Sequence, residues 1–253
     1  ADLARHFVAG GHPLKIVWDC GNGVASSIID KLIAILPQHQ HTILFGEADG
    51  NFPNHHPDPS EEKNLHQLGE KVRALGADLG LAFDGDADRL GVVDNLGRKI
   101  DSHIIAILFT QEILKTNPRA NVVLDVKASI NAMHEIKNLG AGFNFGRIGV
   151  VNIIEQMKKT ASVLGAEVSG HTIFMQPLWY GFDDAFFAAM QVIQANQNMD
   201  KTLSSFVDSL PTSHLSPETR FDCPDDIKFS VVEKIATQLK AEGANFLNID
   251  GVR

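Results

Sequence analysis

Short apolar runs alternate with segments of helical periodicity along almost the whole chain. The apolar runs predict strands at 14–19, 41–46, 78–83, 121–126, 142–145 and 245–249. Helical patterns lie between or beside them at 24–36, 61–75, 102–116, 129–138, 151–164, 183–196 and 227–241. Strands that alternate with helices are typical of parallel sheets covered on both faces, so we predict an α/β fold with doubly wound, three-layer domains.

Glycine marks several of the predicted junctions. Leu-Gly-Ala occurs at 75–77, 139–141 and 164–166, and Glu-Gly-Ala occurs at 242–244. Each glycine predicts the left-handed residue that ends a helix, with a strand after it. The stretch 94–99 predicts a turn between two short strands, because Gly97 can adopt positive φ.

These elements divide the chain into three parts. We expect a first domain over 1–101, a second over 102–211, and a linker rich in Pro, Ser and Thr at 211–219. The rest of 212–253 holds one helix and short strands, which is too little to bury a core of its own. We therefore expect an α+β fragment that is only the opening of a further domain.

Composition narrows the class of protein. The 253 residues include 31 acidic and 22 basic ones, and this excess of negative charge argues against a nucleic-acid partner. It still allows a small phosphorylated ligand, which needs only a few cations. Cys20 and Cys223 lack metal-ligand spacing, and no apolar run approaches the roughly 18 residues of a membrane span. We expect a cytoplasmic protein without membrane contact.

The acidic stretch 84–88 follows the apolar strand at 78–83 directly. In extended backbone Asp84, Asp86 and Asp88 would point to one side, where like charges repel unless a cation lies among them. Oxygen ligands of this kind suit Mg²⁺ or Ca²⁺. The alternative is three solvated aspartates in a turn.

Two phosphate chemistries fit such a strand end. In a haloacid-dehalogenase-like phosphatase Asp84 would be the nucleophile, but the fifth position is normally Thr or Val, and Asp88 stands there. In a metal site for phosphoryl transfer, Arg89 would supply a fork of donors for phosphate oxygens.

A second polar group falls in the other predicted domain. Glu167, Ser169 and His171 alternate, so an extended loop would offer a carboxylate, a hydroxyl and an imidazole to vicinal sugar hydroxyls. Lys127 follows a strand, at the edge where open α/β sheets bind ligands, although an ordinary surface lysine is the alternative.

Two weaker candidates flank these groups. His55 lies in a loop stiffened by prolines, and we expect it to face the cleft, whereas His56 belongs to a rigid interdomain loop. Asp183 and Asp184 are interpreted as caps at a helix start.

Three motifs together resemble those of the α-D-phosphohexomutases, the family of phosphomannomutase and phosphoglucomutase. DGDADR at 84–89 resembles that family's metal-binding loop, GNFPNHHPDP at 50–59 is similar to its FPNHxPDP loop, and GAEVSGH at 165–171 is similar to its sugar-binding loop. DVKAS at 125–129 and WYGFDDA at 179–185 follow the family's order. The resemblance implies the family's second and third domains and the truncated start of its fourth.

The resemblance also implies a reaction. In the family a phosphoserine gives its phosphoryl group to a hexose phosphate, and the bisphosphorylated sugar turns over and returns the other phosphate. It implies Mg²⁺ at the three aspartates, Arg89 beside the transferring group, and Lys127 in proton transfer or phosphate contact. Glu167 and Ser169 would bind the sugar 3- and 4-hydroxyls, and Val168 favours mannose and glucose phosphates over glucosamine phosphate.

The chain departs from the family in three ways. The serine loop of TxSHNP type does not occur in it, and the phosphate-gripping RxSNT loop would lie beyond Arg253. Val150 and Val151 stand where the family usually has His and Ser. We therefore expect a serine domain in the parent protein and no turnover by this chain alone. A non-catalytic module that binds metal or sugar phosphate is the alternative.

Overall fold

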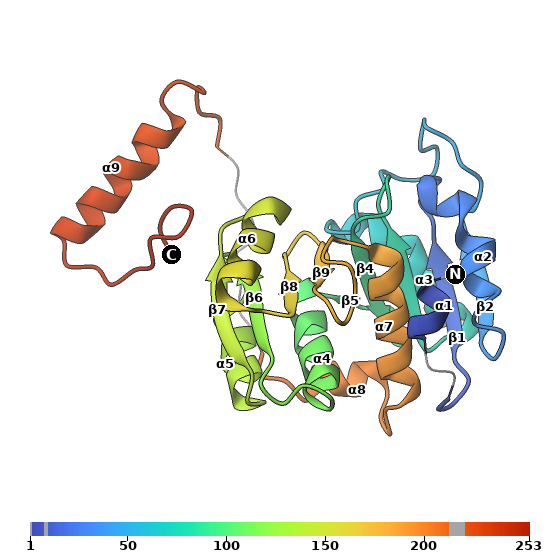
Figure 1. The fold of residues 1–253 in the computed structure, drawn as a ribbon. Coiled ribbons are helices and arrows are strands. Elements are labelled where there is room, and N and C mark those ends of the chain that lie inside the picture. The colour runs from blue at the N-terminus through green and yellow to red at the C-terminus, as the bar shows by residue number, and fades with distance from the viewer. Residues whose placement is uncertain (1, 8–9, 213–220) are drawn as a thin grey trace.

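The computed structural model describes residues 2–7, 10–212 and 221–253, and within them it has two β-sheets flanked by helices (Figure 1). This confirms the predicted α/β class. The sheets occupy residues 15–100 and 121–174, so each lies within one predicted domain. The predicted boundaries near 101 and 211 stay a prediction.

The first sheet has the strand order β2-β1-β3-β4-β5. Its strands are β1 (Lys15–Asp19), β2 (Gln40–Leu44), β3 (Leu79–Phe83), β4 (Leu90–Asp94) and β5 (Lys99–Ile100). β1 pairs in parallel with β2 and β3, whereas β4 runs antiparallel to both β3 and β5. The turn predicted before β5 is present, with Gly97 at φ +75°.

Helices cover both faces of this sheet. Val17 and Ala82 pack on one face with η2 (Glu62–Leu65) and α3 (His66–Leu75). On the other face lie η1 (Val24–Ser27), α2 (Ile29–Ile33) and the side chain of Trp18. Every residue of β3 is buried, because both of its faces are covered. The acidic loop therefore begins where a fully buried strand leaves the core.

The second sheet has the order β7-β6-β8-β9, with β9 antiparallel to β8 and the other pairs parallel. Its strands are β6 (Asn121–Asp125), β7 (Gly142–Gly146), β8 (Leu164–Ala166) and β9 (Thr172–Phe174). Its helices are α4 (Ser102–Leu114), α5 (Ile130–Asn138), α6 (Val150–Thr160), α7 (Ala185–Gln197) and α8 (Leu203–Asp208). β8 and β9 frame the second polar loop.

One buried apolar cluster extends from the first sheet into the second. It contains Trp18 and Phe83 of the first sheet together with Phe109 of α4 and Phe187 of α7. Figure 1 shows α7 between the two sheets, and the ring of Phe186 lies 4.9 Å from that of Phe83. Packing, and not only the connecting chain, holds the sheets in place.

Several sequence predictions need correction. Helices 24–36 and 61–75 each divide into a 3₁₀ turn and a shorter α-helix, and α1 (Asp2–His6), α8 and β9 were not foreseen. Gly165 does not end a helix. α6 ends at Thr160, and the left-handed residue after it is Ala161, with φ +49°. Gly165 lies inside β8, where α6 packs so closely that a Cβ on this residue would clash with Met157 and Ile153.

The last segment contains α9 (Lys228–Ala241), as predicted, but 245–249 is not a strand. A strand requires a ladder partner. Leu247 instead exchanges backbone hydrogen bonds with Arg253 and closes a loop. The predicted linker at 211–219 lies mostly outside the described residues. Across the described ranges no helix has both the length and the apolar character needed to cross a bilayer.

Candidate active site between two loops

The acidic loop folds around the carboxylate of Asp84. This side chain is buried, and its Oδ1 accepts backbone N–H bonds from Asp88 and Arg89 at 3.0 and 3.1 Å. The turn closes through a bond from Ala87 N to Asp84 O, with Ala87 at φ +64°. The loop is therefore bent. The expectation that an extended backbone places the three aspartates on one side was wrong.

The bent loop still gathers its three carboxylates. One oxygen each of Asp84, Asp86 and Asp88 lies within 4.8 Å of the others. Asp86 is exposed, Asp88 is half-buried and Asp84 is enclosed. Carboxylate oxygens at this spacing could hold a hard divalent cation. The donor set therefore fits a divalent cation that prefers oxygen ligands, such as Mg²⁺ or Ca²⁺.

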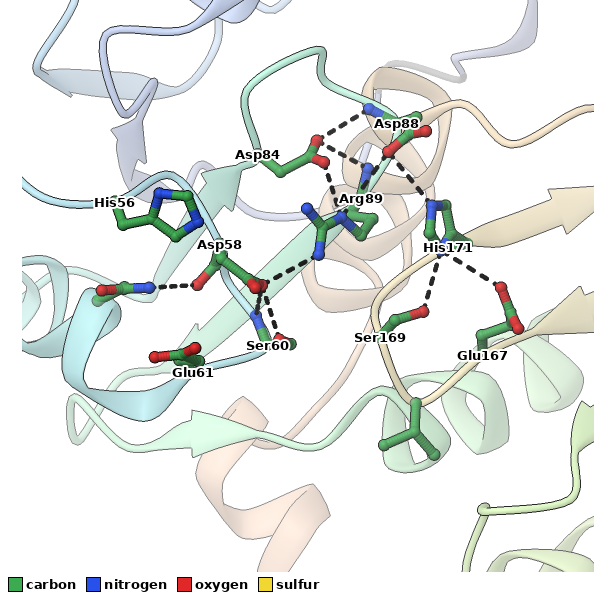
Figure 2. A network of polar contacts seen from close by, with 12 residues as sticks. His56, Asp58, Ser60, Glu61, Asp84, Asp88, Arg89, Glu167, Ser169 and His171 are labelled. Carbon is green, nitrogen blue, oxygen red and sulfur yellow. Dashed lines mark hydrogen bonds and ion pairs between the residues drawn. The ribbon is translucent and has the colours of Figure 1, made fainter. Parts of the chain in front are cut away.

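Arg89 is fixed by two acids. Its Nε donates to Asp84 Oδ2 at 2.7 Å and its Nη1 donates to Asp58 Oδ1 at 3.1 Å (Figure 2). Asp58 is itself oriented by the backbone N–H and the hydroxyl of Ser60. Burial raises the pKa of Asp58, but the bonds from Ser60 and the charge of Arg89 outweigh it, so the pKa is lowered.

The second loop presents Glu167, Ser169 and His171 between β8 and β9. His171 Nδ1 lies 3.0 Å from Ser169 Oγ and 3.3 Å from Glu167 Oε2. Glu167 Oε1 also accepts the N–H of Gly149 at 2.6 Å. Burial raises the pKa of Glu167, but the bonds from His171 and Gly149 outweigh it and the pKa is lowered. The structure thus brings the three predicted residues together.

The two loops meet directly. Arg89 and His171 form an antiparallel β-bridge, and Leu90 N donates to Gly170 O at 3.2 Å. Gly170 has φ +109°, and a Cβ on it would lie 3.0 Å from Leu90 O, so the close approach needs glycine. His171 Nε2 faces Asp88 Oδ1 at 3.3 Å (Figure 2). The acidic loop (84–89) and the polar loop (167–171) therefore form one continuous site.

The pKa of His171 is set by opposing effects at this junction. Burial lowers the pKa of its imidazole, but the bond with Glu167 and the charges of Asp88 and Asp183 outweigh burial. The pKa of His171 is therefore raised above its ordinary value. An imidazole in this position links the carboxylates of both loops.

Lys127 and Val150 lie beside the polar loop. Lys127 is exposed at the end of β6, and its charge helps to lower the pKa of Glu167. Asp125, at the same strand end, accepts N–H bonds from Lys127 and Val168, and burial raises its pKa. Val150 begins α6 immediately after Gly149, next to the backbone N–H that Glu167 binds.

His55 contacts the end of β1. Its Nε2 is 3.1 Å from Asp19 Oδ2, its side chain is 12% exposed, and Asp19 is fully buried. The bond with Asp19 raises the pKa of His55 above its ordinary value. Asp19 is the last residue of β1, which pairs in parallel with β3, the strand that leads into the acidic loop. The predicted role of His55 in substrate binding stays a prediction.

Two site residues were missed from the sequence. Asp58 contacts Arg89 across 31 positions, and only its place in the 50–59 motif could have pointed to it. Asp183 is not a cap. Asp184 alone accepts N–H bonds at the start of α7, whereas Asp183 Oδ2 lies 3.7 Å from His171 Nε2.

Two solved structures have folds similar to that of this chain. A crystal structure described as a phosphoglucomutase/phosphomannomutase family protein from Burkholderia thailandensis matches 100% of this chain and 54% of its own, with a TM-score of 0.88 at 33% identity. A putative phosphomannomutase from Thermus thermophilus matches 82% of this chain and 46% of its own at 19% identity, with a TM-score of 0.69. That second likeness concerns the fold alone. Fold and site define an α/β protein of the phosphohexomutase class.

Sequence comparison gives the family. The family description "Phosphoglucomutase/phosphomannomutase, alpha/beta/alpha domain II" matches residues 6–97, and that of domain III matches 101–214. A phosphomannomutase/phosphoglucomutase of Pseudomonas putida is 40% identical over 240 residues, 95% of this chain and 51% of that protein. A phosphoglucomutase of Neisseria gonorrhoeae is 40% identical over 243 residues, 95% of this chain and 52% of that protein. The chain belongs to the phosphoglucomutase/phosphomannomutase family, and it spans about half the length of these relatives.

Proposed function

We propose that this chain forms the metal-binding and sugar-recognising part of a phosphohexomutase that interconverts hexose 1- and 6-phosphates. The observation that carries the proposal is the contact of the two loops through Arg89 and His171. It joins a carboxylate cluster suited to a divalent cation to a loop suited to sugar hydroxyls. In this proposal 1–101 and 102–211 correspond to the second and third domains of the family, in a cytoplasmic protein.

The acidic loop is proposed to hold Mg²⁺ through Asp84, Asp86 and Asp88. When bound, the ion would neutralise negative charge on a phosphoryl group in transfer. Arg89 is proposed to support the same group. Its ion pairs with Asp84, Asp58 and Asp88 fix the guanidinium in one orientation before any ligand arrives, which lowers the cost of binding.

The polar loop is proposed to bind the sugar. Glu167 and Ser169 offer acceptors and a donor for two adjacent hydroxyls, and His171 orients both by its contacts with them. Lys127 adds a positive charge close to Glu167, where a sugar phosphate would meet it. We propose mannose and glucose phosphates as the substrates.

The phosphoryl donor is proposed to be a phosphoserine from a further domain of the parent protein. The chain alone should therefore not convert substrate. Val150 and Val151 favour a second candidate, a module that binds without chemistry. Neither side chain can donate or accept a proton beside Glu167. A phosphatase that uses Asp84 as nucleophile is disfavoured, because Asp88 stands at the fifth position of the loop, where such phosphatases normally have Thr or Val.

Two measurements test the proposal. Titration calorimetry with Mg²⁺ and then with mannose 1-phosphate should give binding in each step. Glu167→Gln should weaken the sugar step roughly tenfold or more, since a hydrogen bond to a charged group contributes about 1.5–3 kcal/mol. Glu155→Gln, on the exposed face of α6, is the matched control. Absence of binding by the unmodified chain would refute the proposal.

A coupled assay separates the catalytic alternatives. The chain alone should convert no mannose 1-phosphate, and measurable conversion would contradict its proposed dependence on a further domain. Metal-dependent phosphate release that disappears in Asp84→Asn would instead indicate a phosphatase.

A further inference from the structure

A second group of residues that could bind a metal ion shares Asp88 with the acidic loop and extends to the second sheet. Asp88 and His171 come from the two loops, and Asp183 precedes α7. One ligand atom of each lies within 4.8 Å of the others. The set differs chemically from the acidic triplet, because it contains an imidazole nitrogen.

The spacing matches a small tetrahedral ion. His171 Nε2 lies 3.3 Å from Asp88 Oδ1 and 3.7 Å from Asp183 Oδ2. Zinc bonds of about 2.0–2.2 Å in a tetrahedron separate neighbouring ligand atoms by about 3.3–3.6 Å. Both distances from Nε2 are close to this range, and the carboxylates of Asp88 and Asp183 lie within 4.8 Å of each other.

The other face of the imidazole is already oriented. Nδ1 lies 3.3 Å from the buried carboxylate of Glu167 and 3.0 Å from Ser169 Oγ. A histidine that donates Nδ1–H to a carboxylate leaves the Nε2 lone pair for a metal, which is the usual arrangement behind a histidine ligand. Here Nε2 points toward Asp88 and Asp183.

We propose that Asp88, His171 and Asp183 form a site for Zn²⁺ or a similar transition-metal ion, which shares only Asp88 with the proposed magnesium site. One nitrogen and two carboxylate oxygens suit zinc, whereas the triplet of carboxylates suits magnesium. Three protein ligands leave a fourth position open for water or a phosphate oxygen. Asp88 belongs to both sets, so zinc at this site withdraws a ligand from magnesium and ties the two loops together.

Calorimetric titration of the full chain with Zn²⁺ tests the site, in a Cys223→Ser background because that exposed thiol could bind zinc. Asp183→Asn should weaken zinc binding roughly tenfold or more and leave magnesium binding within about twofold. Asp86 belongs only to the acidic triplet, so Asp86→Asn should weaken magnesium binding and leave zinc binding nearly unchanged. His171→Gln provides a second test of the zinc site, with far-UV circular dichroism to confirm folding of each variant.

A competition experiment completes the test. Saturating zinc should weaken magnesium binding to the Cys223→Ser chain, and Asp183→Asn should remove this effect. Zinc affinity unchanged in both Asp183→Asn and His171→Gln would overturn the proposal. So would loss of zinc binding in Asp86→Asn with retention in Asp183→Asn, because the ion would then lie in the triplet.

Discussion

Replacing Arg89 by methionine tests whether the acidic loop depends on positive charge. The substitution keeps much of the apolar stem but removes the partner of Asp84, whose side chain is 2% exposed and bound at 2.7 Å. Removing one member of a buried ion pair costs about 3–5 kcal/mol. Arg89 is 25% exposed, so solvent reduces this, and we expect a loss of about 2–3 kcal/mol in the free energy of unfolding.

Magnesium should restore part of that loss. Without the guanidinium the carboxylates of the loop lose their compensating charge, and a cation that binds only the folded chain stabilises it by about 2.7 kcal/mol at 100 times its dissociation constant. The ion should therefore stabilise Arg89→Met more than the unmodified chain. Urea unfolding, followed by tryptophan fluorescence and far-UV circular dichroism, measures both quantities. Trp18 reports on the region directly, because it stacks on Phe83 next to Asp84.

Arg98 offers a matched control. Its Nε binds the buried Asp94 at 2.8 Å, the same geometry outside the site, but it is 45% exposed. Arg98→Met should cost only about 1 kcal/mol, and magnesium should not restore it. A loss below about 0.5 kcal/mol in Arg89→Met, or equal recovery of both variants with magnesium, would refute the reasoning.

Three further predictions concern the first sheet and the start of α7. Burial raises the pKa of Cys20 to about 12, so Ellman's reagent should modify only the exposed Cys223 until the chain is unfolded; rapid reaction of both thiols would contradict this. The bond with Asp19 raises the folded-state pKa of His55, so His55 stabilises the fold fully below about pH 6 and loses this effect as pH rises through the raised pKa. The difference in unfolding free energy between the unmodified chain and His55→Gln should shrink accordingly, and a constant difference would show that Asp19 does not bind a protonated imidazole. Asp184→Ala should cost about 1–2 kcal/mol, because two backbone N–H groups of α7 lose their acceptor, and an unchanged melting curve would exclude this capping role.

Local pattern predicted most of the fold, because burial on both faces and helical periodicity leave clear signals. The buried strand before Asp84 and the alternation of Glu167, Ser169 and His171 could both be recognised from the sequence. The bend of the acidic loop could not. It depends on Ala87 at positive φ, a conformation that alanine rarely adopts and that the bonds to Asp84 stabilise here.

Contacts between distant segments were the hardest to foresee. Asp58 and Asp183 reach Arg89 and His171 only after the sheets are packed, and periodicity carries no information about such pairs. The prediction of a strand at 245–249 was wrong for a related reason. Its apolar residues fit a strand, but pairing is decided by what lies alongside, and Leu247 pairs with the end of its own loop.

The apolar interior that runs without interruption from the first sheet into α4 and α7 has a consequence for how the site is made. Hinge motion between the sheets would have to open this interior to water, at about 25 cal/mol for each Å² of apolar surface uncovered. The contact of Arg89 with His171 is therefore preassembled when the chain folds, and a ligand need not draw the loops together. We therefore expect the two sheets to keep their relative position when a ligand binds at this junction.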